Sequence, residues 1–128
     1  MSPVTPVSGD DQVLVLGAGG DRYAVELTSV ERVHPVEAVT PLPGLRPPWT
    51  GLVSLRGEMF PALDLPSYLG RAPLGAPRPA VDCAVVIHGG LRVAFLSEAP
   101  VELRPRREGG EMLDVATILA DPALVVND

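Results

Sequence analysis

Apolar and polar positions alternate after a glycine-rich stretch near the start of the chain, in QVLVLGAGGDRYAVEL at residues 12–27. In its second part every other side chain is large and apolar: Tyr23, Val25 and Leu27. A period of two is typical of a strand with one buried face, and aromatic and β-branched residues favour strands. The pattern predicts a β-hairpin with strands at 13–16 and 22–27 and a loop at 17–21.

The same glycines suggest a competing interpretation, the G-x-G-x-x-G loop that holds a dinucleotide at a helix N-terminus. Gly17 and Gly19 fit this motif, but Arg22 occupies the third position. That glycine normally lets the helix pack closely on the strand. The alternation after Arg22 also excludes a helix, so we expect a hairpin and no cofactor.

A second hairpin of the same plan is predicted later in the chain. An apolar run at 83–87 reaches Gly89 and Gly90, and the segment 91–96 returns with alternating apolar side chains. An arginine follows each Gly-Gly pair. The two hairpins suggest a chain of two related halves.

Shorter elements are expected around these hairpins. The apolar runs predict strands at 30–33, 49–56, 59–65 and 101–107, with a tight turn at Gly57-Glu58. Asp114 can cap a short helix at 115–120, which Asp121-Pro122 ends. The 15 prolines and 13 glycines divide the chain into short pieces, as an all-β domain requires.

The chain is expected to hold a single domain at 12–128 behind a flexible leader at 1–11. Within the domain, a Pro-rich connector at 71–81 separates a first half at 12–70 from a second half at 82–128.

Composition narrows the possible functions. With 46% hydrophobic and 20% charged residues, the 128-residue chain can bury a core. A net charge of −6 argues against a nucleic-acid partner. No apolar run is long enough to span or insert into a membrane, and the N-terminus does not resemble a secretory signal. The single cysteine, Cys83, fits a reducing compartment, and we expect a cytoplasmic protein.

The sequence offers no catalytic or metal-binding constellation. His34, Cys83 and His88 lack the paired spacing of a zinc site, and we interpret them as a buried thiol and two surface imidazoles. Asp64 follows an apolar strand, where an aspartate usually accepts backbone hydrogen bonds from the next turn. We therefore predict a protein that is not an enzyme.

Arg56 is the most informative charged residue because it lies at the tip of a strand, before a glycine turn. Such an arginine is often only a solvated charge. Its rigid guanidinium can also bind a carboxylate or backbone carbonyls of a partner.

In its ordered set of short motifs, the chain resembles the CheW family of chemosensory adaptors. The matching pieces are Val13-Leu14-Val15-Leu16, Tyr23-Ala24-Val25, Val30-Glu31-Arg32-Val33, Thr40-Pro41-Leu42-Pro43, Gly51-Leu52-Val53, Leu55-Arg56-Gly57 and Phe60-Pro61-Ala62-Leu63-Asp64-Leu65. The resemblance is dense over 13–70 and weaker over 82–98 and 111–120.

The resemblance implies an all-β fold of two small SH3-like five-stranded barrels, here 12–70 and 82–128, without catalysis or cofactor. It implies two partners, the cytoplasmic tip of a methyl-accepting chemoreceptor and a CheA-type histidine kinase. Other CheW-like proteins are further possible partners. The receptor-binding positions that it implies are Val30, Arg32, Val33, Leu55, Arg56 and Gly57.

Two departures from the family pattern affect these expectations. Family members often carry Glu at the position of Arg32, near the Leu-Arg-Gly arginine, so two positive charges would face each other unless Glu31 or a partner's acid offsets them. The chain also has only 101–110 where the family usually has roughly 25 further residues before the last strand and helix. We expect an incomplete second barrel with an open edge or a different closure, a short C-terminal helix and a weakened kinase contact, similar to divergent adaptors of the FrzB type.

Three functions remain open at this point. The first is an adaptor that couples receptor to kinase, and the second is a receptor-only bridging or inhibitory module that does not recruit kinase. The third is a small β-barrel ligand-binding domain or enzyme.

Overall fold

The glycine-rich stretch near the N-terminus forms a hairpin, as predicted. The computed structural model describes residues 12–74 and 80–124, and it places strands β1 (Gln12–Ala18) and β2 (Asp21–Glu26) antiparallel. Gly19 and Gly20 form the turn with φ of 63° and 86°, a left-handed conformation that glycine adopts at little cost. The turn is shorter than the loop expected at 17–21, because Gly17, Ala18 and Asp21 belong to the strands.

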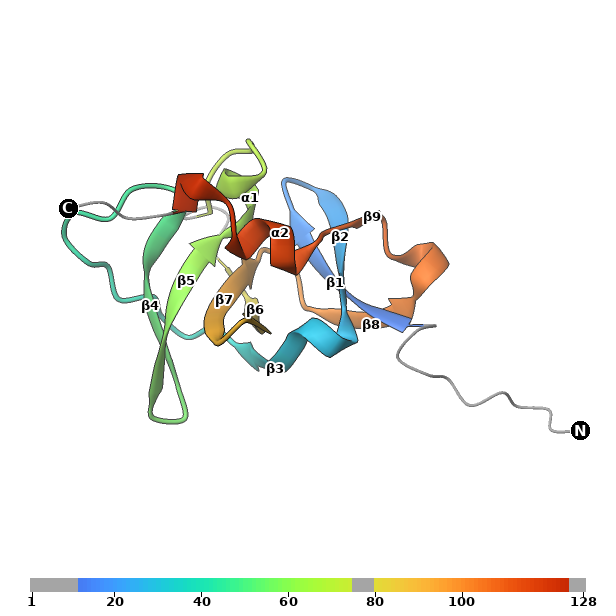
Figure 1. Ribbon diagram of the computed structural model, residues 1–128, viewed down its shortest axis with the longest axis horizontal. Coiled ribbons are helices and arrows are strands. Elements are labelled where there is room, and N and C mark those ends of the chain that lie inside the picture. The colour runs from blue at the N-terminus through green and yellow to red at the C-terminus, as the bar shows by residue number, and fades with distance from the viewer. Residues whose placement is uncertain (1–11, 75–79, 125–128) are drawn as a thin grey trace, which may run out of the picture.

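The described residues form two sheets, which lie on the right and left of Figure 1. The four-stranded sheet has the order β8-β1-β2-β9, with β8 at Glu102–Pro105 and β9 at Glu111–Met112. The five-stranded sheet has the order β3-β6-β7-β5-β4. Its strands are β3 (Val30–Pro35), β4 (Trp49–Leu55), β5 (Glu58–Asp64), β6 (Asp82–His88) and β7 (Leu91–Ser97).

The predicted division of the barrels into 12–70 and 82–128 does not match the strand pairing. The N-terminal hairpin pairs with β8 and β9 from the end of the chain, whereas β3 to β5 share a sheet with β6 and β7. Strand β5 even pairs in parallel with β7, across the connector. The two halves therefore interleave in both sheets.

Side chains at alternating strand positions point to opposite faces of the five-stranded sheet, and each face belongs to a separate hydrophobic core. One face, with Ala84, Val86, Val93 and Phe95, packs against Leu16 and Val25 of the other sheet. The opposite face, with Val53, Phe60, Val85 and Ala94, fills the interior of its own barrel. The loop after β3 closes this barrel, because the backbone N–H and C=O groups of Thr40 pair with Leu52 of β4.

The shortened segment closes the four-stranded sheet differently from a full barrel. After β8, a 3-10 turn at Arg106–Glu108 carries the chain across one face of the sheet to β9. Gly109 is buried there, and a Cβ atom on it would lie 2.8 Å from Val13 Cγ2 and 3.0 Å from Ala24 Cβ. The predicted incomplete barrel is therefore the four-stranded sheet, which both ends of the chain build.

Two short helices complete the described structure. Asp114 caps α2 (Val115–Leu119) by accepting from the backbone N–H of Thr117, as the sequence predicted, and Val115 and Ile118 are buried against the core between the sheets. Helix α1 (Leu65–Tyr68) was not predicted. Within the described ranges, no helix is long and apolar enough to cross a membrane.

Candidate functional site

The β4–β5 turn carries Arg56 at the tip of a hairpin that projects from the five-stranded sheet (Figure 1). The turn consists of Arg56 and Gly57 with φ of 53° and 86°, one residue earlier than predicted. Among the described residues, Arg56 is the one non-glycine residue with a positive φ. This conformation costs roughly 1 kcal/mol or more. Across the described parts of the chain, Arg56 has no hydrogen-bond or ion-pair partner. The turn thus presents an uncompensated, strained cation to solvent.

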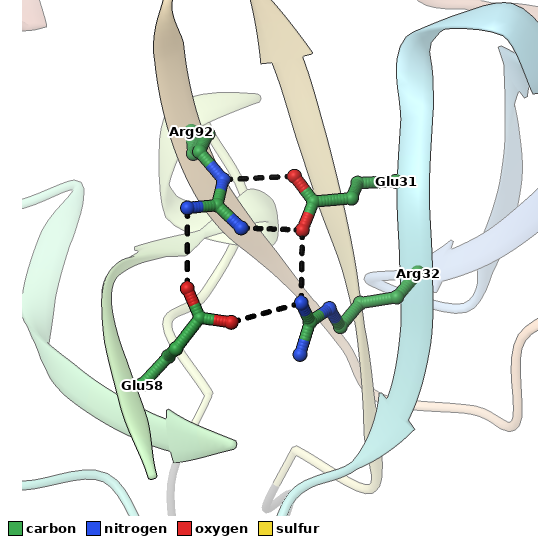
Figure 2. Close-up of polar contacts among 4 residues, drawn as sticks. All are labelled: Glu31, Arg32, Glu58 and Arg92. Carbon is green, nitrogen blue, oxygen red and sulfur yellow. Dashed lines mark hydrogen bonds and ion pairs between the residues drawn. The ribbon is translucent and has the colours of Figure 1, made fainter. Parts of the chain in front are cut away.

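Beside this turn, four charged residues form a closed ring (Figure 2). Arg92 on β7 donates from Nε to Glu31 Oε1 at 2.8 Å and from Nη1 to Glu58 Oε2 at 3.2 Å. Arg32 Nη2 donates to Glu31 Oε2 and to Glu58 Oε1, each at 3.0 Å. The ring is formally neutral and connects strands β3, β5 and β7.

A β-bulge on β3 brings Glu31 into the ring. Val30 pairs with Val86 and Arg32 pairs with Val85, so Glu31 is the extra residue between them. A bulge re-aims a side chain relative to the regular pleat. The hydrogen bonds of Arg92 lower the pKa of the Glu31 carboxyl below its usual 4.5, and Arg32 adds to the effect against desolvation.

The ring covers Phe60 at one end of the barrel interior. The guanidinium carbons of Arg92 and Arg32 lie 4.9 and 5.4 Å from the centroid of the Phe60 ring, within the range of cation–π attraction. The planar guanidinium groups therefore shield an apolar core residue while their polar edges remain paired.

The pairing of Arg32 resolves the first departure from the family pattern. The sequence predicted two opposing positive charges unless Glu31 or a partner offset them. Both Glu31 and Glu58 pair with Arg32 inside the chain. Arg32 is consequently neutralised, and Arg56 is left as the free cation of this turn.

The six predicted receptor-binding residues differ in their exposure. Glu58 connects Arg32 to the Arg56-Gly57 turn, since it pairs with Leu55 across the hairpin and bonds to Arg32. Leu55 itself is only 2% exposed and belongs to the barrel core. Val30 is half-buried against the core between the sheets, and Val33 is 40% exposed. The exposed members of the set are thus Val33, Arg56 and Gly57.

The structure also shows an apolar groove whose lining residues were not predicted from the sequence. Its volume is about 270 Å³, and it lies between the five-stranded sheet and the segment that runs from the end of α2 through a 3-10 turn at Pro122–Leu124. The apolar part of its lining consists of Trp49, Pro61, Leu91, Val93, Leu119, Ala120 and Leu124. Leu91 is 54% exposed, and Met59 on β5 is 51% exposed. In the sequence, Leu91 continues the apolar alternation of Val93 and Phe95. The pattern therefore does not show that Leu91 is exposed while the other two are buried.

The remaining candidates for chemistry have structural roles. Asp64 accepts from the backbone N–H groups of Ser67 and Leu74, as expected of a strand-end aspartate, and so begins α1. Cys83 is buried, which raises the pKa of its thiol to about 11. Among the described residues there is no group of three or more metal-ligating side chains close enough to hold an ion.

The fold thus consists of a five-stranded barrel and a smaller four-stranded sheet, and the charged Arg56 turn projects from the barrel. The chain belongs to the CheW-like domain family, which matches residues 12–104. It is 31% identical over 55 residues to the chemotaxis protein CheW of Bacillus subtilis (strain 168), a match that spans 43% of this chain and 35% of that protein.

The fold is also similar to the crystal structure of the scaffolding protein TtCheW from Thermoanaerobacter tengcongensis. The TM-score is 0.63 with 21% sequence identity, over 74% of this chain and 64% of the TtCheW chain. At this identity the match establishes the fold. In both comparisons, less than two thirds of the relative's length is spanned.

Proposed function

We propose that this chain is a non-catalytic adaptor of a bacterial chemosensory array, which binds the cytoplasmic tip of a methyl-accepting chemoreceptor and couples it to a CheA-type histidine kinase. Membership of the CheW-like family supports the adaptor role. The observation that carries the receptor-binding part is the Arg56 turn, where a strained arginine without a partner among the described residues projects from the sheet.

In this proposal the receptor contact is divided between direct and supporting residues. Arg56 binds a carboxylate or the terminal carbonyls of the receptor helices, and Val33 contributes apolar contact. Gly57 allows the turn through its positive φ. Leu55 and Val30 support the site indirectly, because they anchor β4 and β3 in the two hydrophobic cores. Arg32 keeps Glu58 paired, so that Glu58 does not neutralise Arg56.

A receptor-only bridging or inhibitory module is the second candidate function. The supporting observation is the four-stranded sheet, in which a short crossing replaces part of a barrel. If the kinase's regulatory domain contacts both barrels, this reduction weakens kinase binding more than receptor binding. The two candidates share the receptor site and differ only in the kinase contact.

The receptor site is tested by titrating a receptor cytoplasmic fragment against the parent chain and two variants. Arg56→Ala should weaken binding about tenfold, the loss expected for a charge-assisted hydrogen bond of roughly 1.5 kcal/mol. Arg22→Ala is the matched control, because it removes another exposed arginine near a hairpin turn. Equal affinities for all three proteins would show that Arg56 is only a solvated charge.

Kinase coupling is tested separately with the isolated regulatory domain of a CheA-type kinase. Binding in the micromolar range or tighter would support coupling. Receptor binding without kinase binding at about 100 µM would support the receptor-only module.

A further inference from the structure

Strand β8 forms an outer edge of the four-stranded sheet. Its inner side pairs with β1, from Gln12 opposite Pro105 to Val15 opposite Glu102. No strand of the described residues pairs with its outer side. Leu103, in the middle of the strand, is 51% exposed. An open edge with an exposed leucine is a place where another strand can add.

Other edges of the two sheets are covered or interrupted. Thr40 pairs with Leu52 on the outer side of β4, the bulge interrupts β3, and β9 has only two residues. Strand β8 offers four residues, of which only Pro105 lacks a backbone N–H, and contains no bulge in its pairing with β1. It is therefore the most regular free edge in the described chain.

The side chains of β8 are complementary to themselves. Glu102 and Arg104 share one face of the strand and pair with each other at 2.6 Å, whereas Leu103 lies on the opposite face, across from Leu14. In an antiparallel pair centred on Leu103, Glu102 of each copy faces Arg104 of the other copy. Leu103 then faces Leu103, so opposite charges meet on one face and apolar side chains meet on the other.

We propose that β8 is a dimerisation edge through which two copies of this chain pair antiparallel and join their four-stranded sheets into one continuous sheet. A two-fold axis through Leu103 generates this isologous contact. The β4–β5 turn with Arg56 belongs to the other sheet and stays free in the dimer. The proposal is independent of what Arg56 binds.

Charged residues on an edge strand can also serve to prevent pairing. They do so when like charges meet, whereas here the antiparallel register brings together charges of opposite sign. Charge reversal distinguishes the two roles, because an edge that only blocks association has no dimer to lose.

The test is sedimentation equilibrium of four proteins and one mixture. The parent chain should show a concentration-dependent dimer. Glu102→Arg alone places Arg against Arg, and Arg104→Glu alone places Glu against Glu, so each should weaken dimerisation about tenfold or more. An equimolar mixture of these two variants should form a heterodimer as strong as the parent dimer. The double variant E102R/R104E should form a homodimer of the same strength.

Matched controls remove the effects of net charge and folding. Glu37→Arg and Arg22→Glu change the net charge by the same amounts at exposed positions outside β8 and should leave the dimer unchanged. Arg104 also lies 3.6 Å from Glu108 within the chain, but restoration by mixing cannot come from that contact. A parent chain that stays monomeric up to about 1 mM would overturn the proposal. A dimer of unchanged strength in both charge-reversal variants would also overturn it. So would a failure of the mixed single variants to recover dimerisation.

Discussion

Arg92 and Glu31 are 61 positions apart in the chain, yet they form a two-point contact in which Nε and Nη2 of the arginine donate to the two carboxylate oxygens. This contact connects β7 to the bulge of β3. It leaves Arg92 Nη1 free to reach Glu58, so the ring beside the Arg56 turn depends on it.

Replacing Arg92 with Gln should raise the pKa of Glu31 toward its usual 4.5, because the largest cause of its depression is removed. A carboxylate with a lowered folded-state pKa stabilises the fold above the unfolded pKa and loses that contribution as the pH falls through the folded value. The parent should therefore lose more stability below pH 4.5 than Arg92→Gln does. NMR titration of the Glu31 carboxyl measures the shift, and Arg104→Gln, which removes a distant arginine, should not change it.

Arg56→Gly and Arg56→Ala should separate the strain of the turn from its binding role. Both lose the guanidinium, but only glycine adopts φ near 53° without cost. The glycine variant should be more stable than the alanine variant by about 0.5–1 kcal/mol, after allowing for the greater freedom of glycine when unfolded. Urea denaturation measures the difference, and both variants should bind receptor equally weakly. Equal stabilities would mean that the turn is not strained at Arg56.

Gly110→Ala should destabilise the chain where it crosses to β9. Gly110 has φ of 79°, and a Cβ atom there would lie 2.4 Å from the carbonyl oxygen of Arg22. We expect a loss of about 2 kcal/mol or more in the free energy of unfolding. Gly90→Ala has a similar φ of 85° with open space around it, and it should cost only about 1 kcal/mol. Equal losses of stability in the two variants would show that a Cβ atom at position 110 does not clash with the Arg22 carbonyl group.

An aspartate at Val25 or Leu63 should unfold the whole chain and not one barrel alone. Both residues are fully buried in the core that joins the two sheets. An unpaired charge there costs several kcal/mol, comparable to the stability of a small domain. Loss of near-ultraviolet circular dichroism and of dispersed amide NMR signals would report it. A variant that melts like the parent would contradict the assigned strand facing.

Tyr68→Phe should cost about 1 kcal/mol at neutral pH, through the lost hydrogen bond, and should remove a loss of stability that the parent shows in alkali. The Tyr68 hydroxyl donates to Asp121 Oδ2 at 2.7 Å, and burial together with this carboxylate raises the pKa of Tyr68 to about 12. The unfolded chain releases this proton near pH 10, so the parent should lose stability as the pH rises from 10 toward 12. Tyr68→Phe should lack this loss. Thermal unfolding at pH 9 and pH 11 measures it, and parallel losses in both proteins would exclude Tyr68 as the source.

Local signals in the sequence were sufficient for the hairpins and the caps. Period-two alternation and Gly-Gly turns identified both hairpins, and Asp114 correctly began α2. Helix α1 was missed because four residues are too few for a helical period, although Asp64-Leu65-Pro66 has the composition of a helix start. The turn at Arg56 was placed one residue late because arginine rarely adopts a left-handed φ.

The candidate site was only partly predictable. Arg56 stood out by its place at a strand tip, and Glu31 was recognised as a possible counter-charge to Arg32. Arg92 and Glu58 could not be assigned to the same ring, because no local pattern brings β7 and β5 beside the bulge of β3. The groove beside Leu91 was missed for the same reason.

By itself, the sequence determined which segments are extended, where they reverse and which family they resemble, because backbone sterics and side-chain alternation act between near neighbours. Only the tertiary structure decided which strands pair. Apolar strand faces are interchangeable in sequence, and the combination that buries them all joins β1 and β2 to the last strands of the chain and places β5 beside β7. That same choice left Arg56 without a counter-charge within the described residues and the outer side of β8 open.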